Sequence, residues 1–240
     1  GCISLKNIRI PDSVTSIGSN AFEECVSLKS IIIPDSVTRI EGWTFYYCKS
    51  LESIIIPDSV TSIGDSAFSD CKSLININIP NGVTSIGDSA FSNCHSLTSV
   101  TIPSSVIAIG TNPFCGCPAD LKNESKAFIY EHNVLFNKDK TTLISYRAKE
   151  ANYVIPDSVT SIGEGAFLEC NSLTSIIIPD SVTSIGVCAF AQCNSLTSIN
   201  IPDSVTIVAL FPLVAFHFYQ YIGIPRILER MCFHYLYLEA

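Results

Sequence analysis

The sequence has few basic residues, and they are scattered along the chain. Its 240 residues include 14 lysines and arginines against 22 aspartates and glutamates, so the formal net charge is −8 and the pI is near 4.9. Nucleic acids and anionic membrane surfaces bind cationic patches, and the sequence contains no cluster of Lys or Arg. The composition therefore argues against both kinds of partner.

The sequence also lacks a visible signal peptide. It opens with Gly-Cys-Ile-Ser-Leu, which matches the middle of a repeat instead of a natural start. We therefore expect the native N-terminus to be truncated, so the lack of a targeting segment says nothing about the compartment.

Catalytic and metal-binding constellations are missing too. His95 follows Cys94, but adjacent side chains on such a segment point apart, and no third group is placed to orient the histidine. Cys115 and Cys117 form a close pair without the second Cys or His pair that a zinc site needs. We expect no enzyme activity, no cofactor and no metal.

What the sequence does contain is a proline that returns every 23 residues, with one longer gap. Eight prolines occupy this position: Pro11, Pro34, Pro57, Pro80, Pro103, Pro156, Pro179 and Pro202. A fixed period of roughly 20–30 residues indicates supersecondary units that stack because none buries its apolar face alone. The period predicts a solenoid.

A phenylalanine stands eleven residues after the proline in seven copies. These residues are Phe22, Phe45, Phe68, Phe91, Phe114, Phe167 and Phe190. Because most of them follow an alanine, small and large side chains alternate as packed cores require. We expect the phenylalanines to form a ladder through the core.

The pattern Leu-x-x-Ile-x-Ile precedes most of the prolines, as in residues 28–33. Its last three residues alternate as a strand does, with the outer two isoleucines pointing inward and the middle residue outward. Stacked copies predict a parallel sheet. The proline ends each strand because it lacks an amide donor, and the Asp-Ser that usually follows favours a turn.

A glycine closes a second apolar stretch in most repeats, and we expect it to adopt positive φ. This glycine is Gly18, Gly64, Gly87, Gly110, Gly163 or Gly186. The segment after it, such as residues 65–71, begins with residues that cap helices and predicts about one helical turn.

Eight of the eleven cysteines fall at one repeat position. They are Cys2, Cys25, Cys48, Cys71, Cys94, Cys117, Cys170 and Cys193. A column of identical inward residues is interpreted as a ladder of buried thiols, because cysteine packs as a small apolar residue. Disulfides and metal binding are the alternatives.

The whole pattern, Leu-x-x-Ile-x-Ile-Pro-x-x-Val-x-x-Ile-Gly-x-x-Ala-Phe-x-x-Cys, resembles the BspA-type (treponemal-type) leucine-rich repeats over residues 1–206. The resemblance implies a β-rich α/β repeat, a right-handed leucine-rich-repeat solenoid of stacked parallel strands. It also implies a surface or secreted protein of mucosal bacteria or protozoa that adheres to host matrix proteins or to other cells. The alternative is a cytoplasmic scaffold that binds proteins through the same repeat.

One insertion interrupts the repeats at about residues 119–151. Residues 134–136 (Val-Leu-Phe) and 142–146 (Thr-Leu-Ile-Ser-Tyr) flank a polar turn, which predicts a β-hairpin. Similar hairpin insertions occur in the family that the repeats resemble. The hairpin is either a structural elaboration or a lip that contacts a ligand.

Residues 207–240 form an apolar tail in which the repeat pattern is lost. Residues 207–224 could form a short membrane span, although they contain Pro212, His217 and Gln220. A terminal cap on the solenoid and an out-of-frame ending are the other two interpretations. The oligomeric state is left open.

The outward residue of each strand is the candidate ligand-binding position. It is Arg9, Ile32, Ile55, Asn78, Thr101, Val154, Ile177 or Asn200. On a half-solvated sheet this position should be polar, so Ile32 and Ile55 stand out, with Lys29 and Glu52 beside them. We expect a protein ligand, such as a host matrix or cell-surface protein, to bind this column.

Overall fold

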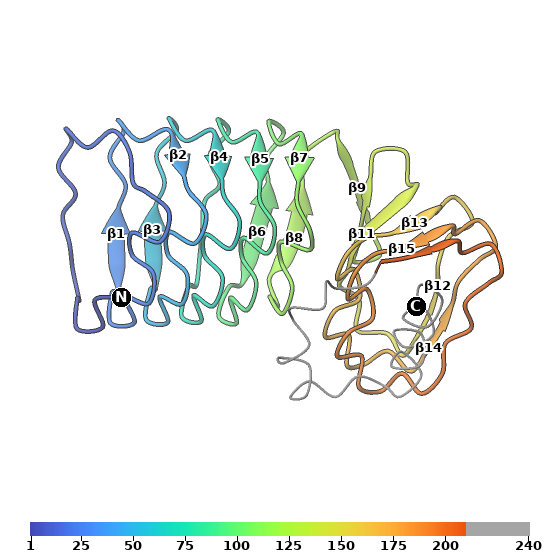
Figure 1. The fold of residues 1–240 in the computed structure, drawn as a ribbon. Coiled ribbons are helices and arrows are strands. Elements are labelled where there is room, and N and C mark those ends of the chain that lie inside the picture. The colour runs from blue at the N-terminus through green and yellow to red at the C-terminus, as the bar shows by residue number, and fades with distance from the viewer. Residues whose placement is uncertain (210–240) are drawn as a thin grey trace, which may run out of the picture. The chain divides into compact units, whose positions relative to one another are not determined.

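The computed structural model describes residues 1–209 (Figure 1), which divide into two compact units between residues 130 and 131. Both units consist of short parallel strands stacked one coil above the next. The insertion adds an antiparallel pair of strands to the second unit. Among the described residues no helix is present. The predicted solenoid of stacked parallel strands with a hairpin insertion is confirmed.

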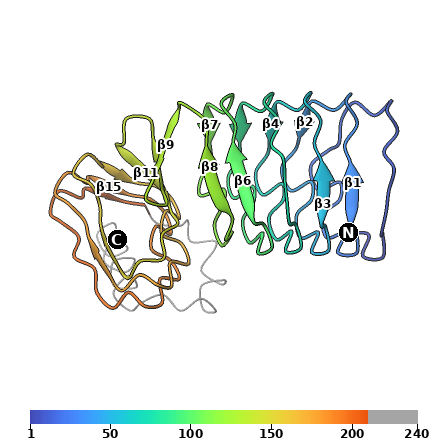
Figure 2. The ribbon, with the colours of Figure 1, turned by 180° about the vertical axis from the view of Figure 1, so that it is seen from behind.

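The first unit has two parallel sheets, which lie on different sides of the coils (Figures 1 and 2). Its strands are β1 (Ser30–Ile32), β2 (Arg39–Ile40), β3 (Ser53–Ile55), β4 (Ser62–Ile63), β5 (Ser85–Ile86), β6 (Ser99–Ile102), β7 (Ala108–Ile109) and β8 (Asp120–Asn123). The pairs β1-β3 and β6-β8 are connected through isolated bridges at Asn76, and the other sheet has the order β2-β4-β5-β7.

The second unit repeats this arrangement after the insertion. Strand β9 (Phe128–Glu131) spans the boundary, and the unit contains β10 (Val134–Asn137), β11 (Thr142–Tyr146), β12 (Asn152–Val154), β13 (Ser161–Ile162), β14 (Ser175–Ile177), β15 (Ser184–Ile185) and β16 (Ile207–Val208). Strands β11, β13, β15 and β16 are parallel, β10 is antiparallel to β11, and β12 pairs with β14.

The phenylalanines form the predicted ladder. In the first unit the rings of Phe22, Phe45, Phe68, Phe91 and Phe114 stack at centroid distances of 5.4–5.6 Å, with interplanar angles of at most 7°. All of them except the first, which is half-buried, are fully enclosed. Offset stacking of aromatic rings adds to the stabilisation from burial alone, so this column is the central element of the core.

Tyr146 takes the ladder position in the coil formed by the insertion. Its ring stacks on Phe167 at 5.0 Å, and its amide donates to the carbonyl of Ala166, as the amide of Phe45 donates to that of Ala67. Phe136, on the other strand of the hairpin, is also buried. The hairpin therefore uses its aromatic side chains for packing, as a structural elaboration does.

The expected positive φ at the repeated glycines is wrong. Positive-φ glycines are Gly116 and Gly165, which lie at other repeat positions. A Cβ on Gly87 would lie 2.5 Å from the amide nitrogen of Asp65, in the preceding coil, and one on Gly64 would lie 2.5 Å from that of Gly42. Glycine is used at these two positions because a Cβ there would overlap the backbone of the preceding coil.

The expected helical turn is wrong as well, because two residues of the segment have positive φ. In residues 65–71 these are Ser66, at 52°, and Asp70, at 60°. The amides of Ser66, Phe68 and Asp70 donate to carbonyls of the next coil at 2.7–2.8 Å. The positive-φ residues direct alternate amides toward the neighbouring coil. In an α-helix these amides would donate to carbonyls of the same segment.

Backbone pairing continues slightly beyond the repeat boundary at residue 206. Strand β16 pairs with β15 in the repeat register, with Ile207 opposite Ser184. The interpretations of the apolar tail fall almost entirely on residues 210–240, which lie outside the described part. Within residues 1–209, no helix has the length and hydropathy to cross a membrane.

The close approach at glycine yields a matched pair of substitutions. Gly87→Ala should destabilise the protein by about 1–3 kcal/mol, because the new methyl group overlaps the backbone of the preceding coil. Gly18→Ala, at the equivalent position, meets no atom within 4 Å and should leave stability unchanged. Urea unfolding of both variants checks this, and equal midpoints would show that the glycine is not required by coil spacing.

Candidate binding surfaces

The structure brings Ile32 and Ile55 together on the outer face of the first unit. They are register partners in the parallel pair β1-β3, and their exposed fractions are 63% and 59%. Ile31 and Ile54, which precede them in the two strands, are buried. The predicted inward and outward alternation is present, and it leaves an adjacent pair of large apolar side chains in solvent.

The second unit carries an equivalent pair. Val154 and Ile177 are register partners in β12-β14, with exposed fractions of 61% and 59%. Each unit therefore presents two neighbouring β-branched apolar residues on its outer strand face. These side chains are not part of the core, because the alternate strand positions fill it.

The other residues predicted for the site form the polar remainder of the column. Arg9, Asn78 and Asn200 are exposed, and Thr101 is half-buried opposite Lys122. In the first unit, Lys29 and Glu52 form an exposed ion pair, with Nζ and Oε1 3.4 Å apart. The column is thus an outer face as predicted, while its role in binding stays a prediction.

The cysteine column is enclosed in most coils, but Cys2 is exposed and Cys170 is half-buried. The Sγ atoms of Cys48, Cys71, Cys94 and Cys193 donate hydrogen bonds of 3.0–3.2 Å to carbonyl oxygens of ladder phenylalanines in the preceding coil, 26 residues earlier. None of these four cysteines is in a disulfide. Burial raises the pKa of the Cys48 thiol to about 12 and raises those of Cys71 and Cys94 as well.

No reactive arrangement forms around Cys94 and His95. The Cys94 thiol donates to the carbonyl of Phe68, while Nδ1 of His95 lies 3.1 Å from the carbonyl oxygen of Gly116. A thiol with a raised pKa is a poor nucleophile, because the thiolate is the reactive form. Within residues 1–209, no three His, Cys, Asp or Glu side chains are grouped to hold a metal ion.

Comparison with protein families decides what the repeat is. The model of the BspA type leucine rich repeat region matches residues 1–119 and 145–231, in six copies. The chain belongs to the BspA-type leucine-rich-repeat family. The predicted family is confirmed, and the gap between the two matched ranges, residues 120–144, lies within the insertion predicted at about residues 119–151.

Three solved structures show the same kind of fold. A leucine-rich repeat protein from Bacteroides ovatus is 32% identical, with 81% of this chain and 49% of that chain covered and a TM-score of 0.55. A leucine rich cell surface protein from Faecalibacterium prausnitzii is 32% identical, with coverages of 85% and 69% and a TM-score of 0.62. The pneumococcal vaccine antigen PcpA is 26% identical, with coverages of 80% and 57% and a TM-score of 0.62.

The chain spans about half the length of the Bacteroides ovatus protein. A search of the curated proteins found no match.

One group of surface residues departs from the BspA-type repeat and was missed by the sequence analysis. Trp43, Tyr46 and Tyr47, in the turn segment after β2, form a cluster in which Trp43 packs edge-on against Tyr46 at 4.8 Å and Tyr46 lies 5.8 Å from Tyr47. Trp43 is the single tryptophan of the chain and is 42% exposed. Comparing the same repeat position in every coil could have found it.

The thiol column makes stability depend on pH. The folded Cys48 thiol has a pKa raised above that of an unfolded thiol, about 8.5, so its contribution is complete below that pH and is lost as the pH rises toward about 12. The urea midpoint should therefore decrease as the pH is raised from about 8 to about 10.5.

The variant Cys48→Ser provides the control for this pH dependence. Its hydroxyl can keep the hydrogen bond to the carbonyl of Phe22 and does not titrate, so the fall in the midpoint should be smaller than in the parent chain. An identical fall in both proteins would show that Cys48 is not enclosed as described.

Proposed function

We propose that this chain is a protein-binding, adhesive surface module without catalytic activity, and that its ligand binds the exposed strand face. The observation that carries the proposal is the pair Ile32 and Ile55, side by side in solvent on adjacent strands. Repeat arrays present extended surfaces of this kind to partners.

The energetic argument rests on the area that the two isoleucines offer. Full burial of an isoleucine side chain stabilises a complex by roughly 1.5–3 kcal/mol before the costs of association. A neighbouring pair on rigid, hydrogen-bonded strands loses little conformational freedom on binding, because both β-branched side chains are already restricted. A flat apolar centre of this sort supports recognition of another protein surface.

Charged side chains adjoin this apolar centre. Lys29 and Glu52 precede the two isoleucines by three residues in their own coils, and each is largely exposed. An apolar centre with a polar rim is the usual anatomy of a protein interface, in which the rim guides the approach of the partner. The arrangement supports a protein ligand over a small molecule, which requires a concave pocket.

A location at the cell surface is supported by the relatives and is compatible with the thiols. The Faecalibacterium relative is described as a cell surface protein and the pneumococcal relative as a vaccine antigen. Burial and a raised pKa slow the oxidation of Cys48, Cys71 and Cys94, so these three thiols are compatible with an oxidising compartment. The cytoplasmic scaffold therefore gains no support from these residues.

Replacing the apolar pair should remove binding and preserve the fold. The double variant Ile32→Ser with Ile55→Ser should bind at least tenfold more weakly to a matrix protein that the parent chain recognises. The measurement is surface plasmon resonance against purified extracellular-matrix proteins immobilised one at a time. Circular dichroism should show no change, because neither side chain is in the core.

Ile107→Ser is the matched control, since Ile107 is 72% exposed but lies next to β7 in the other sheet. It loses a similar apolar surface and should bind as the parent chain does. Unchanged affinity in the folded double variant, or equal losses in the double variant and the control, would contradict the strand face as the binding surface.

A further inference from the structure

The aromatic cluster of Trp43, Tyr46 and Tyr47 lies outside the core column of its own coil. Phe45, between them, occupies the ladder and is fully buried, whereas Trp43 is exposed and the two tyrosines are half-buried. The three rings contact one another at 4.8 and 5.8 Å. Trp and Tyr in contact on a rigid surface are the residues that most often dominate binding energies.

Two of the three aromatic residues occupy backbone positions that disfavour them. The φ of Trp43 is 62° and that of Tyr47 is 60°. The residues equivalent to Trp43 are small, polar or glycine: Asn20, Ser66, Ser89, Asn112, Gly165 and Cys188. Bulky side chains are unfavourable in the left-handed region, and such strain is concentrated at functional sites.

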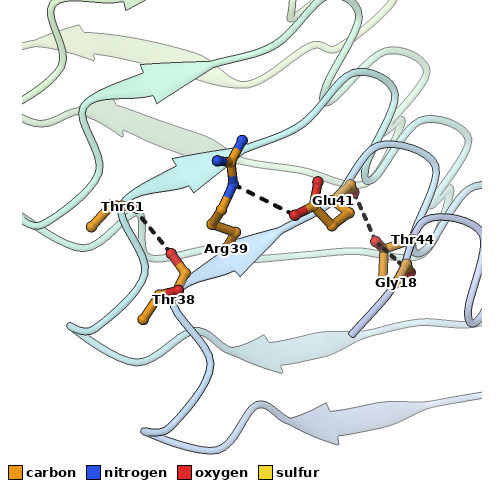
Figure 3. A network of polar contacts seen from close by, with 6 residues as sticks. All are labelled: Gly18, Thr38, Arg39, Glu41, Thr44 and Thr61. Carbon is orange, nitrogen blue, oxygen red and sulfur yellow. Dashed lines mark hydrogen bonds and ion pairs between the residues drawn. The ribbon is translucent and has the colours of Figure 1, made fainter. Parts of the chain in front are cut away.

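The turn that carries the cluster is fixed by a buried hydroxyl. Thr44 stands where most coils have alanine, and its Oγ1 donates to the carbonyl oxygen of Glu41 at 2.7 Å and lies 3.5 Å from that of Gly18 (Figure 3). The amides of Trp43 and Tyr47 donate to the next coil at 2.8 Å. The rings are therefore held in place before any ligand arrives, which lowers the entropic cost of binding.

Carboxylates border the cluster on both sides. Burial raises the pKa of Tyr46, and the charges of Asp70, Glu23 and Glu24 raise it further. Glu24 lies in the preceding coil, where its amide donates to the carbonyl of Tyr46 at 2.8 Å, and Asp70 lies in the following coil, where Lys72 already pairs with it at 3.4 Å. Nζ of Lys49 lies 4.0 Å from the centre of the Tyr47 ring, so one aromatic face already holds a cation. Glu23 and Glu24 are the carboxylates that can attract a further cation.

From this geometry we infer that the cluster is a docking surface for a basic peptide segment of a partner protein, with an arginine side chain stacked on Trp43. A guanidinium group is planar, stacks on aromatic faces and pairs with carboxylates, so it matches both the rings and the border. This surface lies in the turn segment after β2, while the strand face described above lies in β1 and β3. The two surfaces are tested separately.

The probe is a fluorescently labelled peptide of alternating Arg and Gly, titrated with the full chain while its anisotropy is recorded. Saturable binding is expected, together with a change in the fluorescence of Trp43, the single tryptophan. Trp43→Asn should weaken binding at least tenfold without changing any charge, so general electrostatic attraction cannot account for the loss. Its melting temperature should equal or exceed that of the parent chain, because asparagine tolerates positive φ, as Asn20 and Asn112 do.

Two further variants test charge and independence. Glu24→Gln should weaken peptide binding severalfold, whereas Asp58→Asn, which loses the same charge in a Pro-Asp turn where Asn81 occurs naturally, should not. The double variant Ile32→Ser with Ile55→Ser should bind the peptide as the parent chain does. A loss of binding in that double variant would contradict a separate surface.

Any one of four results would overturn the inference. The first is no saturable binding of the Arg-Gly peptide, and the second is equal affinity for a peptide of alternating Glu and Gly. The third is a saturable change in Trp43 fluorescence with a neutral oligosaccharide, cellohexaose, in place of the basic peptide, which would make the cluster a sugar-binding surface. Unchanged binding in Trp43→Asn would equally exclude the stacking arrangement.

Discussion

The structure depends on the close approach of each backbone coil to the next. Alternate amides of the turn segment, at Ser66, Phe68 and Asp70, donate to the following coil, and the strand amides do the same on the other sides. This spacing leaves no room for a Cβ at Gly87. Every buried position must then pack against its own equivalent one coil away, so the sequence repeats.

Function is accordingly carried by the positions that the stacking leaves free to vary. Inward positions hold mostly Ile, Val, Leu, Ala, Phe or Cys because each column must remain continuous, while outward positions can change without cost to the core. Ile32 and Ile55 on the strand face and Trp43 in a turn segment are exposed residues at such positions. Their exposure makes them the candidates for recognition, and Trp43 also differs from the small or polar residues at the equivalent positions.

The repeated features of the fold could be predicted from sequence because each depends on one residue type that recurs at the same repeat position. Phe68 and Cys71 were assigned to the core from their period alone, and both are fully buried. The conformation of Gly87 could not be predicted, because glycine is used both for positive φ and for close approach, and only the neighbouring coil distinguishes these uses. Tyr146 escaped prediction because the insertion breaks the 23-residue period that would have aligned it with Phe167.

The candidate site was partly predictable for the same reason. Strand alternation placed Ile32 outside correctly, since a period of two residues decides the face. The aromatic cluster was not predicted, because Trp43 and Tyr47 occupy positions where the repeat has small or polar residues. Both have positive φ, and each contacts Tyr46. Side chains that meet through irregular backbone leave no periodic signal.

The central claim, that the close stacking of coils aligns the aromatic rings of each unit into a column that stabilises it, is tested most directly by truncating a ring in the middle of the first unit's column. Phe68→Ala should lower the free energy of unfolding by about 3–5 kcal/mol, because it removes a fully buried ring that stacks on both neighbours. Ile107→Ala, which truncates an exposed apolar side chain, should change it by less than about 0.5 kcal/mol. Equal urea midpoints for the two variants would contradict the account.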